Sequence, residues 1–156
     1  QLAPLALQKN LKLMFVKPKT ALPKLIMDKE KLRQVINNMI DNAIKYTKHG
    51  EIKVGLEQTP TDLVLKVKDT GKGMDENELE AAFEKYGRGK DSKKYAAGLG
   101  LGLYLARVIV EQHNGKIWAE SAGEGQGSEF AFSLPIHNKI KPTSLIFDLT
   151  KTQTIK

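Results

Sequence analysis

The chain has 156 residues, 40% of them hydrophobic, which suits one globular domain with a substantial core. It contains no cysteine, and this excludes disulfide bonds and thiolate metal sites. We find no signal peptide and no apolar run long enough to cross a bilayer. The formal net charge of +7 comes mostly from scattered lysines with few aromatic residues among them, which favours a solvated basic surface over a nucleic-acid site.

The first half of the chain predicts two short strands, a helix and a hairpin. The opening segment, QLAPLALQKN, is ambiguous and fits the tail of an upstream helix. Residues 11–16 and 24–28 are predicted to be short strands, and Asp28 is a plausible N-cap for a helix that runs to about Tyr46. Residues 51–58 and 62–69 alternate between polar and apolar and are joined by Thr-Pro-Thr, which predicts a hairpin.

The second half predicts two helices and two strands. Residues 75–86 form a short helix with acidic residues in its first turn, and an apolar helix over 99–113 ends at an Asn-Gly pair. Strands are expected over 116–121 and 128–135. The tail after Pro135 is basic, and its one apolar segment fits either an edge strand or a docking element. Helices interleaved with hairpin-connected strands predict an α+β fold with the helices on one face of a sheet.

The predicted 28–46 helix carries an unusual polar stripe. Asparagine is a poor helix former, yet three of them occur in the stretch NNMIDNAIKYT, residues 37–47. At about 100° per residue, Asn38, Asn42 and Lys45 fall on one side, opposite the apolar stripe. An amide oxygen suits one position around Mg²⁺, and a lysine one turn further on can meet phosphates. Taken alone, the stripe also fits a solvated polar face.

Two glycine clusters follow strands or lead into helices. In DTGKGM, Asp69 ends a predicted strand, and Gly71 and Gly73 allow a tight turn and a close approach of a ligand, although an ordinary turn fits equally well. GLGLGL, residues 98–103, leads into a helix, where free amides can bind phosphate. It lacks the spacing of a dinucleotide fold, and no Walker-type sequence exists in the chain.

The order of these motifs is more specific than any one of them. NNMIDNAIKYT, DTGKGM, FEKYGR, GLGLGL and GQGSEF together resemble the ATP-binding catalytic domain of sensor histidine kinases, which belongs to the wider family of type II topoisomerase and mismatch-repair ATPases. The resemblance covers roughly Leu25 to Pro135. It implies the Bergerat fold, a two-layer α/β sandwich with a mixed, mostly antiparallel sheet, and ATP with Mg²⁺ as cofactors.

The resemblance also implies roles for individual residues. Asn42 is similar to the Mg²⁺ ligand, Asn38 and Lys45 to phosphate-side contacts, Tyr46 to a residue flanking the adenine, and Asp69 to the acceptor of the adenine amine, in a pocket shaped by Gly71 and Gly73. Phe83 and Arg88 match the family's F-box, whose arginine is expected to reach the γ-phosphate. Gly98, Gly100 and Gly102, with Leu101 and Leu103, match the lid hinge and phosphate cradle, in which Leu99 is also expected to contact the nucleotide. Gly127 and Ser128 match the last glycine motif. Arg88, Asn38 and Lys45 are the expected catalytic residues.

Three departures from the family bear on activity. Leu99 stands where many members carry Thr or Ser, and Gly87 stands where the F-box often has an aromatic residue. In the related ATPases a glutamate one turn before the metal-binding asparagine acts as general base. Here that position resembles Asn38, which predicts slow hydrolysis. Residues 87–97 are expected to form a lid.

No histidine in the chain has the surroundings of a phosphoacceptor, because His49 lies in a turn, His113 at a helix end and His137 in the tail. We therefore expect the γ-phosphoryl group to go to a histidine on a separate dimerisation domain, and a response regulator to act downstream. Residues 1–24 are read as a lead-in from that domain plus the first strand, 25–135 as the catalytic domain and 136–156 as an extension. We expect a cytoplasmic location, as the cytoplasmic part of a membrane-bound sensor, without nucleic-acid contact and without membrane contact by this chain. A protein-serine kinase of the anti-sigma type, a scaffold without transfer activity and a basic nucleic-acid binder remain alternatives.

Overall fold

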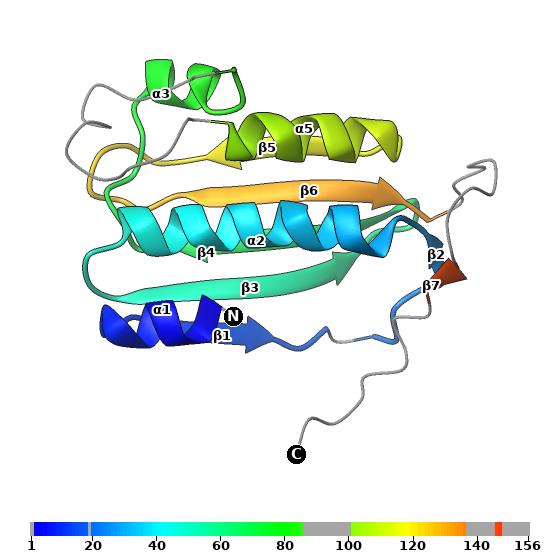
Figure 1. Ribbon diagram of the computed structural model, residues 1–156, viewed down its shortest axis with the longest axis horizontal. Coiled ribbons are helices and arrows are strands. Elements are labelled where there is room, and N and C mark those ends of the chain that lie inside the picture. Colours follow the sequence, from blue (N-terminus) through cyan, green and yellow to red (C-terminus); the bar gives the residue numbers. More distant parts are fainter. Residues whose placement is uncertain (1, 19, 86–100, 137–145, 148–156) are drawn as a thin grey trace.

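A computed structural model of the chain describes residues 2–18, 20–85, 101–136 and 146–147. Five strands form one sheet in the order β1-β3-β4-β6-β5, and helices cover one of its faces (Figure 1). The strands are β1 (Lys12–Val16), β3 (Glu51–Gln58), β4 (Asp62–Asp69), β5 (Lys116–Glu120) and β6 (Glu129–Pro135). Only the β1–β3 pair is parallel among the pairs of this sheet. The predicted two-layer α+β architecture and the predicted hairpin are therefore confirmed.

The core lies between the sheet and its covering helices. Cross-strand partners share a face of the sheet, so Val67 of β4 lies in one row with Val54 of β3 and Phe130 of β6. All three side chains are buried. Leu65 and Leu63, two and four residues earlier on β4, are buried on the same face. The alternation that predicted these strands thus supplies one apolar face for helix packing.

The central helix, α2 (Lys29–Tyr46), lies across this face with α1 (Leu2–Gln8) and α5 (Gly102–Gln112) beside it (Figure 1). The Asp28 side chain accepts hydrogen bonds from two backbone amides of the first turn, as its predicted N-cap role requires. The residues that α2 buries lie on the predicted apolar side; they are Leu32, Val35, Met39, Ala43 and Ile44. The helix thus turns its polar stripe, which carries Asn38 and Asn42, away from the core.

Helix α5 is fixed against α2 by a buried histidine. His113 is 6% exposed, and its Nε2 accepts a 3.0 Å hydrogen bond from the backbone N–H of Asp28. Its Nδ1 lies 2.8 Å from the carbonyl oxygen of Ile109, so Nδ1 carries the proton. Asn114 follows with a φ of 57°, the left-handed conformation with which helices commonly end. His113 therefore has a structural role where α5 meets the start of α2.

Helix α3 (Glu76–Ala81) is shorter than the predicted 75–86 helix. Asp75 and Glu78 form a reciprocal capping box at its start. The chain leaves the α-helical pattern at Ala82, where tighter i→i+3 bonds take over, such as Glu84 N to Ala81 O. The Phe83 ring then packs edge-on against Phe130, with centroids 6.1 Å apart. The packing of Phe83 onto the sheet thus competes with a continuation of α3.

A second, two-stranded sheet lies at the opposite end of the molecule from the loop that follows β4. It pairs β2 (Leu25–Ile26) with β7 (Ile146–Phe147) in antiparallel register (Figure 1). The apolar segment of the tail thus adds a strand beside β2, one of the two outcomes that the sequence left open. Among the segments that the structure describes, no helix is long and apolar enough to cross a membrane.

Candidate nucleotide site

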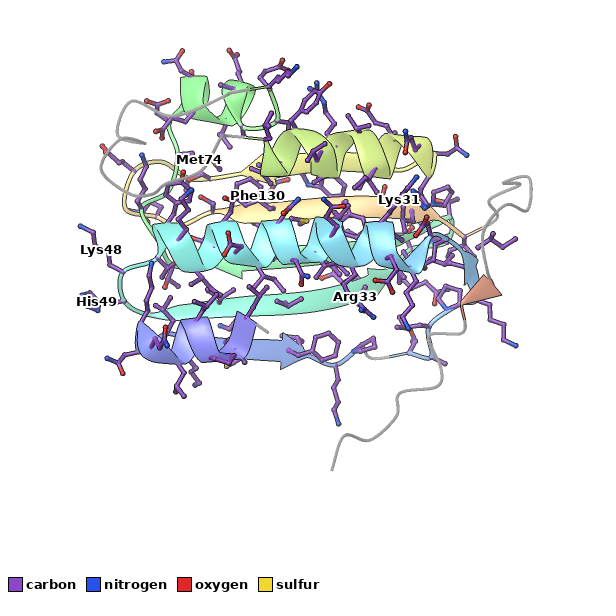
Figure 2. All side chains as sticks on the ribbon, viewed as in Figure 1. Lys31, Arg33, Lys48, His49, Met74 and Phe130 are labelled. Atoms are coloured by element: carbon purple, nitrogen blue, oxygen red, sulfur yellow. The ribbon has the colours of Figure 1, made fainter. Side chains whose placement is uncertain are left out.

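Most of the described candidate residues come together at one end of the sheet. The C-terminus of α2, the N-terminus of α5, the end of β4 and the loop between β5 and β6 all reach this end (Figure 1). Figure 2 shows Lys48 and His49 projecting outward from the loop after α2 at the same end. Arg88, Gly98, Leu99, Gly100 and the expected 87–97 lid lie outside the described residues.

The polar stripe of α2 is half-buried along Asn38, Asn42 and Lys45. The Nδ2 atom of Asn38 donates a 2.9 Å hydrogen bond to the carbonyl oxygen of Gly102, the first residue of α5. A Cβ atom added at Gly102 would lie 3.5 Å from Asn38 Cγ, at ordinary van der Waals distance. The stripe therefore faces the start of α5 at Asn38.

The C-terminus of α2 is held by a residue that the sequence reading missed. Lys9 Nζ, just after α1, donates to the carbonyl oxygens of Ile44 and Lys45 at 2.9 and 3.3 Å. A cation in this place satisfies carbonyls that the helix end leaves open and interacts favourably with the helix dipole. Lys45 Nζ lies 5.5 Å from the ring centroid of Tyr46. Lys45 and Tyr46, both candidates, thus stand at a stabilised helix end.

Asp69 is the buried carboxylate of the site, with 4% of its surface exposed. Its Oδ1 accepts hydrogen bonds from the backbone N–H groups of Gly71, at 2.8 Å, and Ser128, at 3.3 Å. Among the described residues, none donates a hydrogen bond to Oδ2. Burial raises the pKa of Asp69 above its usual value, and the two amide donors offset part of that rise. The carboxylate is therefore fixed through one oxygen, while the other can take a further donor.

The glycines of the two predicted motifs are required by close contacts between two loops. Gly127 has a φ of +72°, and a Cβ atom there would lie 2.1 Å from the carbonyl oxygen of Asp69. Gly73 has a φ of +70°, and a Cβ atom there would clash in the same way with the carbonyl oxygen of Gly123. The N–H of Gly127 donates to the carbonyl oxygen of Gly71 at 3.1 Å. The loop after β4 and the loop before β6 therefore pack against each other around Asp69.

Ser121 joins these loops and was not among the candidates. Its Oγ accepts a 3.0 Å hydrogen bond from the N–H of Met74 and donates a 2.7 Å hydrogen bond to the carbonyl oxygen of Gly127. A second missed contact is the ion pair between Glu84 and Arg107, 2.9 Å apart, which ties the segment after Phe83 to α5. No local sequence signal marks either contact, because each joins residues distant in the chain.

A metal ion at this end would depend on few protein ligands. The described residues contain no group of three His, Cys, Asp or Glu side chains that could hold a metal ion. Asn42 is half-buried on the polar stripe and offers one uncharged amide oxygen. This donor set fits an ion such as Mg²⁺, which keeps several waters and takes its other ligands from phosphate.

The helix arrangement, the buried carboxylate between two glycine loops and the amide stripe define a nucleotide-binding ATPase of the kind found in histidine kinases. The chain belongs to the family described as histidine kinase-, DNA gyrase B- and HSP90-like ATPases, whose model matches residues 27–138. This confirms the resemblance to the sensor kinase domain that the motifs indicated.

Relatives agree with this assignment. The chain is 42% identical over 132 residues to the adaptive-response sensory kinase SasA of Synechocystis sp. strain PCC 6803, a match covering 83% of this chain and 34% of that protein. It is 45% identical over 96 residues to the sensor histidine kinase YvrG of Bacillus subtilis strain 168, covering 61% of this chain and 17% of YvrG. The chain thus spans about a third or less of the length of these relatives.

Two solved structures share the fold. Full-length ShkA in complex with AMPPNP matches with a TM-score of 0.76 and 27% identity, over 86% of this chain and 27% of that one. The catalytic domain of the histidine kinase ThkA, in a nucleotide-free form, matches with a TM-score of 0.72 and 28% identity, over 86% of both chains. The ThkA match spans nearly the whole of an isolated catalytic domain.

Proposed function

We propose that this chain binds ATP with Mg²⁺ at the Asp69 end of the sheet and transfers the γ-phosphoryl group to a histidine of a dimerisation domain in its parent protein. The observation that carries the proposal is the burial and hydrogen bonding of Asp69. A buried carboxylate with one oxygen held by two backbone amides presents its second oxygen to a donor. The exocyclic amine of adenine is such a donor.

The phosphate end of the nucleotide would lie along the polar stripe of α2. Lys45 supplies a positive charge, and Asn38 and Asn42 supply amides on the same half-buried face. The N-terminus of α5 at Gly102 faces this stripe, and free amides at a helix N-terminus favour anions. Mg²⁺, held through Asn42, would offset the charge of the phosphate oxygens. Arg88 is proposed to reach the γ-phosphate from the F-box.

The chain's residues favour transfer over hydrolysis. Asn38 occupies the position proposed for a general base, yet an amide takes up no proton at neutral pH, and its Nδ2 already donates to Gly102. Loss of a general base lowers a rate by about 10²–10⁴-fold. Phosphoryl transfer depends chiefly on positioning and charge stabilisation, which a docked histidine can exploit without that base. The site would therefore hold ATP intact until an acceptor histidine arrives.

The parent protein would supply the remaining parts of the reaction. Residues 1–24 are proposed to lead in from the acceptor-helix domain, 25–135 to act as the catalytic domain and 136–156 to extend it. A response regulator would receive the phosphoryl group from the acceptor histidine. We place the catalytic domain in the cytoplasm, where ATP is available, as part of a sensor.

The test combines binding with transfer. Calorimetry with ADP should show binding that Mg²⁺ strengthens in the wild type and does not strengthen in Asn42→Ala. With labelled ATP the chain alone should stay unlabelled, turn ATP over far more slowly than about one per second, and label an added acceptor domain with acid-labile phosphate. Arg88→Ala should remove that labelling while ADP affinity stays nearly unchanged.

Each alternative gives a different result. Acid-stable phosphate on serine would favour the protein-serine kinase. ADP binding without any labelling would favour the scaffold. Several turnovers of ATP per second by the isolated chain would contradict the kinase proposal. An absence of heat with ADP and ATP at millimolar concentrations would overturn nucleotide binding itself.

A further inference from the structure

Thr47, which follows the last residue of α2, has a buried hydroxyl group without a partner. The residue is 0% exposed, and its Oγ1 is the only buried side-chain nitrogen or oxygen without a hydrogen bond in the described part of the chain. A buried hydroxyl without a partner is unfavourable for folding, because it gives up its hydrogen bonds to water without replacing them. Valine has nearly the same shape and would avoid this penalty, so the hydroxyl calls for an explanation beyond packing.

The hydroxyl lies at the carboxylate of Asp69. A Cβ atom added to Gly71 would be 2.9 Å from Thr47 Oγ1 and 2.8 Å from Asp69 Oδ1, so both oxygens lie within 3 Å of one point. The absence of a side chain at Gly71 lets these two oxygens and the carbonyl oxygen of Tyr46 gather around this point. A hydroxyl donates to a carboxylate readily, and such a bond is stronger than one between neutral groups. No hydrogen bond joins the two oxygens in this structure, so forming one would require the hydroxyl to move toward the carboxylate.

We propose that Thr47 is a positioning residue for base recognition: its hydroxyl donates to the carboxylate of Asp69 when a nucleotide is bound, and so orients Oδ2 toward the amine of the base. This inference rests on the proposed nucleotide-binding function. In the structure as it stands, Oδ1 has two backbone donors and Oδ2 has none among the described residues. A third donor lets the carboxylate stay ionised while it accepts from the base.

Charged side chains near Asp69 do not take over this role. The causes of the raised pKa of Asp69 are burial, opposed by the amides of Gly71 and Ser128, with no charged side chain among them. On the neighbouring strand β3, Glu51 pairs with Lys53. In the loop after β4, Lys72 pairs with Glu78, with Nζ and Oε1 2.8 Å apart. On α2, Lys45 lies over the Tyr46 ring. The Thr47 hydroxyl is thus the hydrogen-bond donor near Asp69 that has no partner among the described residues.

The test compares Thr47→Val with Thr47→Ser and the wild type in the same chain. Thr47→Val keeps the shape and removes the donor, so ADP affinity at neutral pH should fall by about three- to tenfold. The midpoint of the pH profile of ADP affinity should also move to higher pH, because a lost donor raises the pKa of the carboxyl group in the complex. Thr47→Ser keeps the hydroxyl and should stay within about twofold of the wild type at every pH.

A stability measurement separates this role from a structural one. Without nucleotide, Thr47→Val should unfold at the same or a higher urea concentration than the wild type, because the variant removes an unsatisfied hydroxyl. A lower unfolding midpoint, or an ADP affinity and pH profile equal to the wild type, would overturn the positioning role while leaving nucleotide binding intact. Failure of the wild type to bind ADP would instead overturn the proposed function, and this inference with it.

Discussion

The side-chain amide of Asn38 donates a 2.9 Å hydrogen bond to the carbonyl oxygen of Gly102, which joins the middle of α2 to the first residue of α5. This contact explains one of the asparagines in a helix where they are otherwise unfavourable. It also separates Asn38 from its neighbour Asn37, whose side chain has no hydrogen bond to a described residue.

Replacing Asn38 by alanine should lower the free energy of unfolding by about 1 kcal/mol, because a part-buried hydrogen bond between two helices is lost. Urea denaturation followed by circular dichroism measures this change. Asn37→Ala is the matched control, with equal or slightly higher stability expected because alanine is the better helix former. Equal effects of the two substitutions would contradict the importance of the contact.

The pH dependence of binding should follow Asp69. Its folded pKa lies above the usual 3.8 because of burial. The amine of the base is proposed to donate its hydrogen bond to the ionised carboxylate. ADP affinity should therefore rise with pH from about 3.8 through the raised pKa, and calorimetry in buffers of different ionisation enthalpy should detect proton release on binding.

Asp69→Asn should remove this pH dependence, and should weaken adenine nucleotides more than other bases. The contribution of Asp69 to folding stability changes with pH in the direction opposite to ADP affinity. The folded state binds the Asp69 proton more tightly than the unfolded state, so this residue's contribution to stability falls as pH rises through the same interval. An affinity for ADP that is flat across the interval in the wild type would contradict the role of the carboxylate.

The buried histidine should matter for stability alone. His113→Ala removes the acceptor of the Asp28 N–H and the donor to the Ile109 carbonyl, and we expect a loss of about 2 kcal/mol in the free energy of unfolding. His49→Ala, at an exposed position, should change stability by less than about 0.5 kcal/mol. Phosphate recovered on either histidine after incubation with ATP would contradict the structural role.

Two glycines with almost the same backbone conformation should differ in their response to alanine. Gly127 and Gly125 have φ angles of +72° and +77°, but a Cβ atom at Gly127 would clash with Asp69 O, whereas none of the described atoms lies within 4 Å at Gly125. Gly125→Ala should lower the free energy of unfolding by about 1–2 kcal/mol, because alanine is strained in the left-handed conformation. Gly127→Ala should cost more and also weaken ADP binding, since it displaces the Asp69 strand end. Equal losses in thermal unfolding would contradict the predicted clash.

Local patterns carried most of the fold prediction. Asp28 as N-cap, the 51–58 and 62–69 hairpin and the Asn114 stop could be read because capping, alternation and turn residues act within a few positions. Asp69 and Gly71 stand two residues apart in one motif, and the structure joins them by a hydrogen bond.

The missed contacts share a physical cause. Lys9 caps α2 across 35 residues, and Ser121 joins Met74 across 47. Neither residue type is unusual for its local segment, so only the packed fold gives them a role. The end of α3 was predicted too late because the helical pattern continues through Phe83, whereas contact with Phe130 directs the chain elsewhere. Thr47 could not be selected because an unsatisfied hydroxyl is a property of its surroundings.

Helices α2 and α5 are joined at both ends of α5. Asn38 holds the first residue of α5, and His113, directly after its last residue, holds the backbone of Asp28. The two attachments are separated by eleven residues of α5, about 16 Å along its axis. With two such points fixed, α5 can neither slide along α2 nor rotate about its own axis without breaking a hydrogen bond. A force applied at Gly102 is therefore transmitted to the N-terminus of α2, and the two helices behave as one mechanical unit.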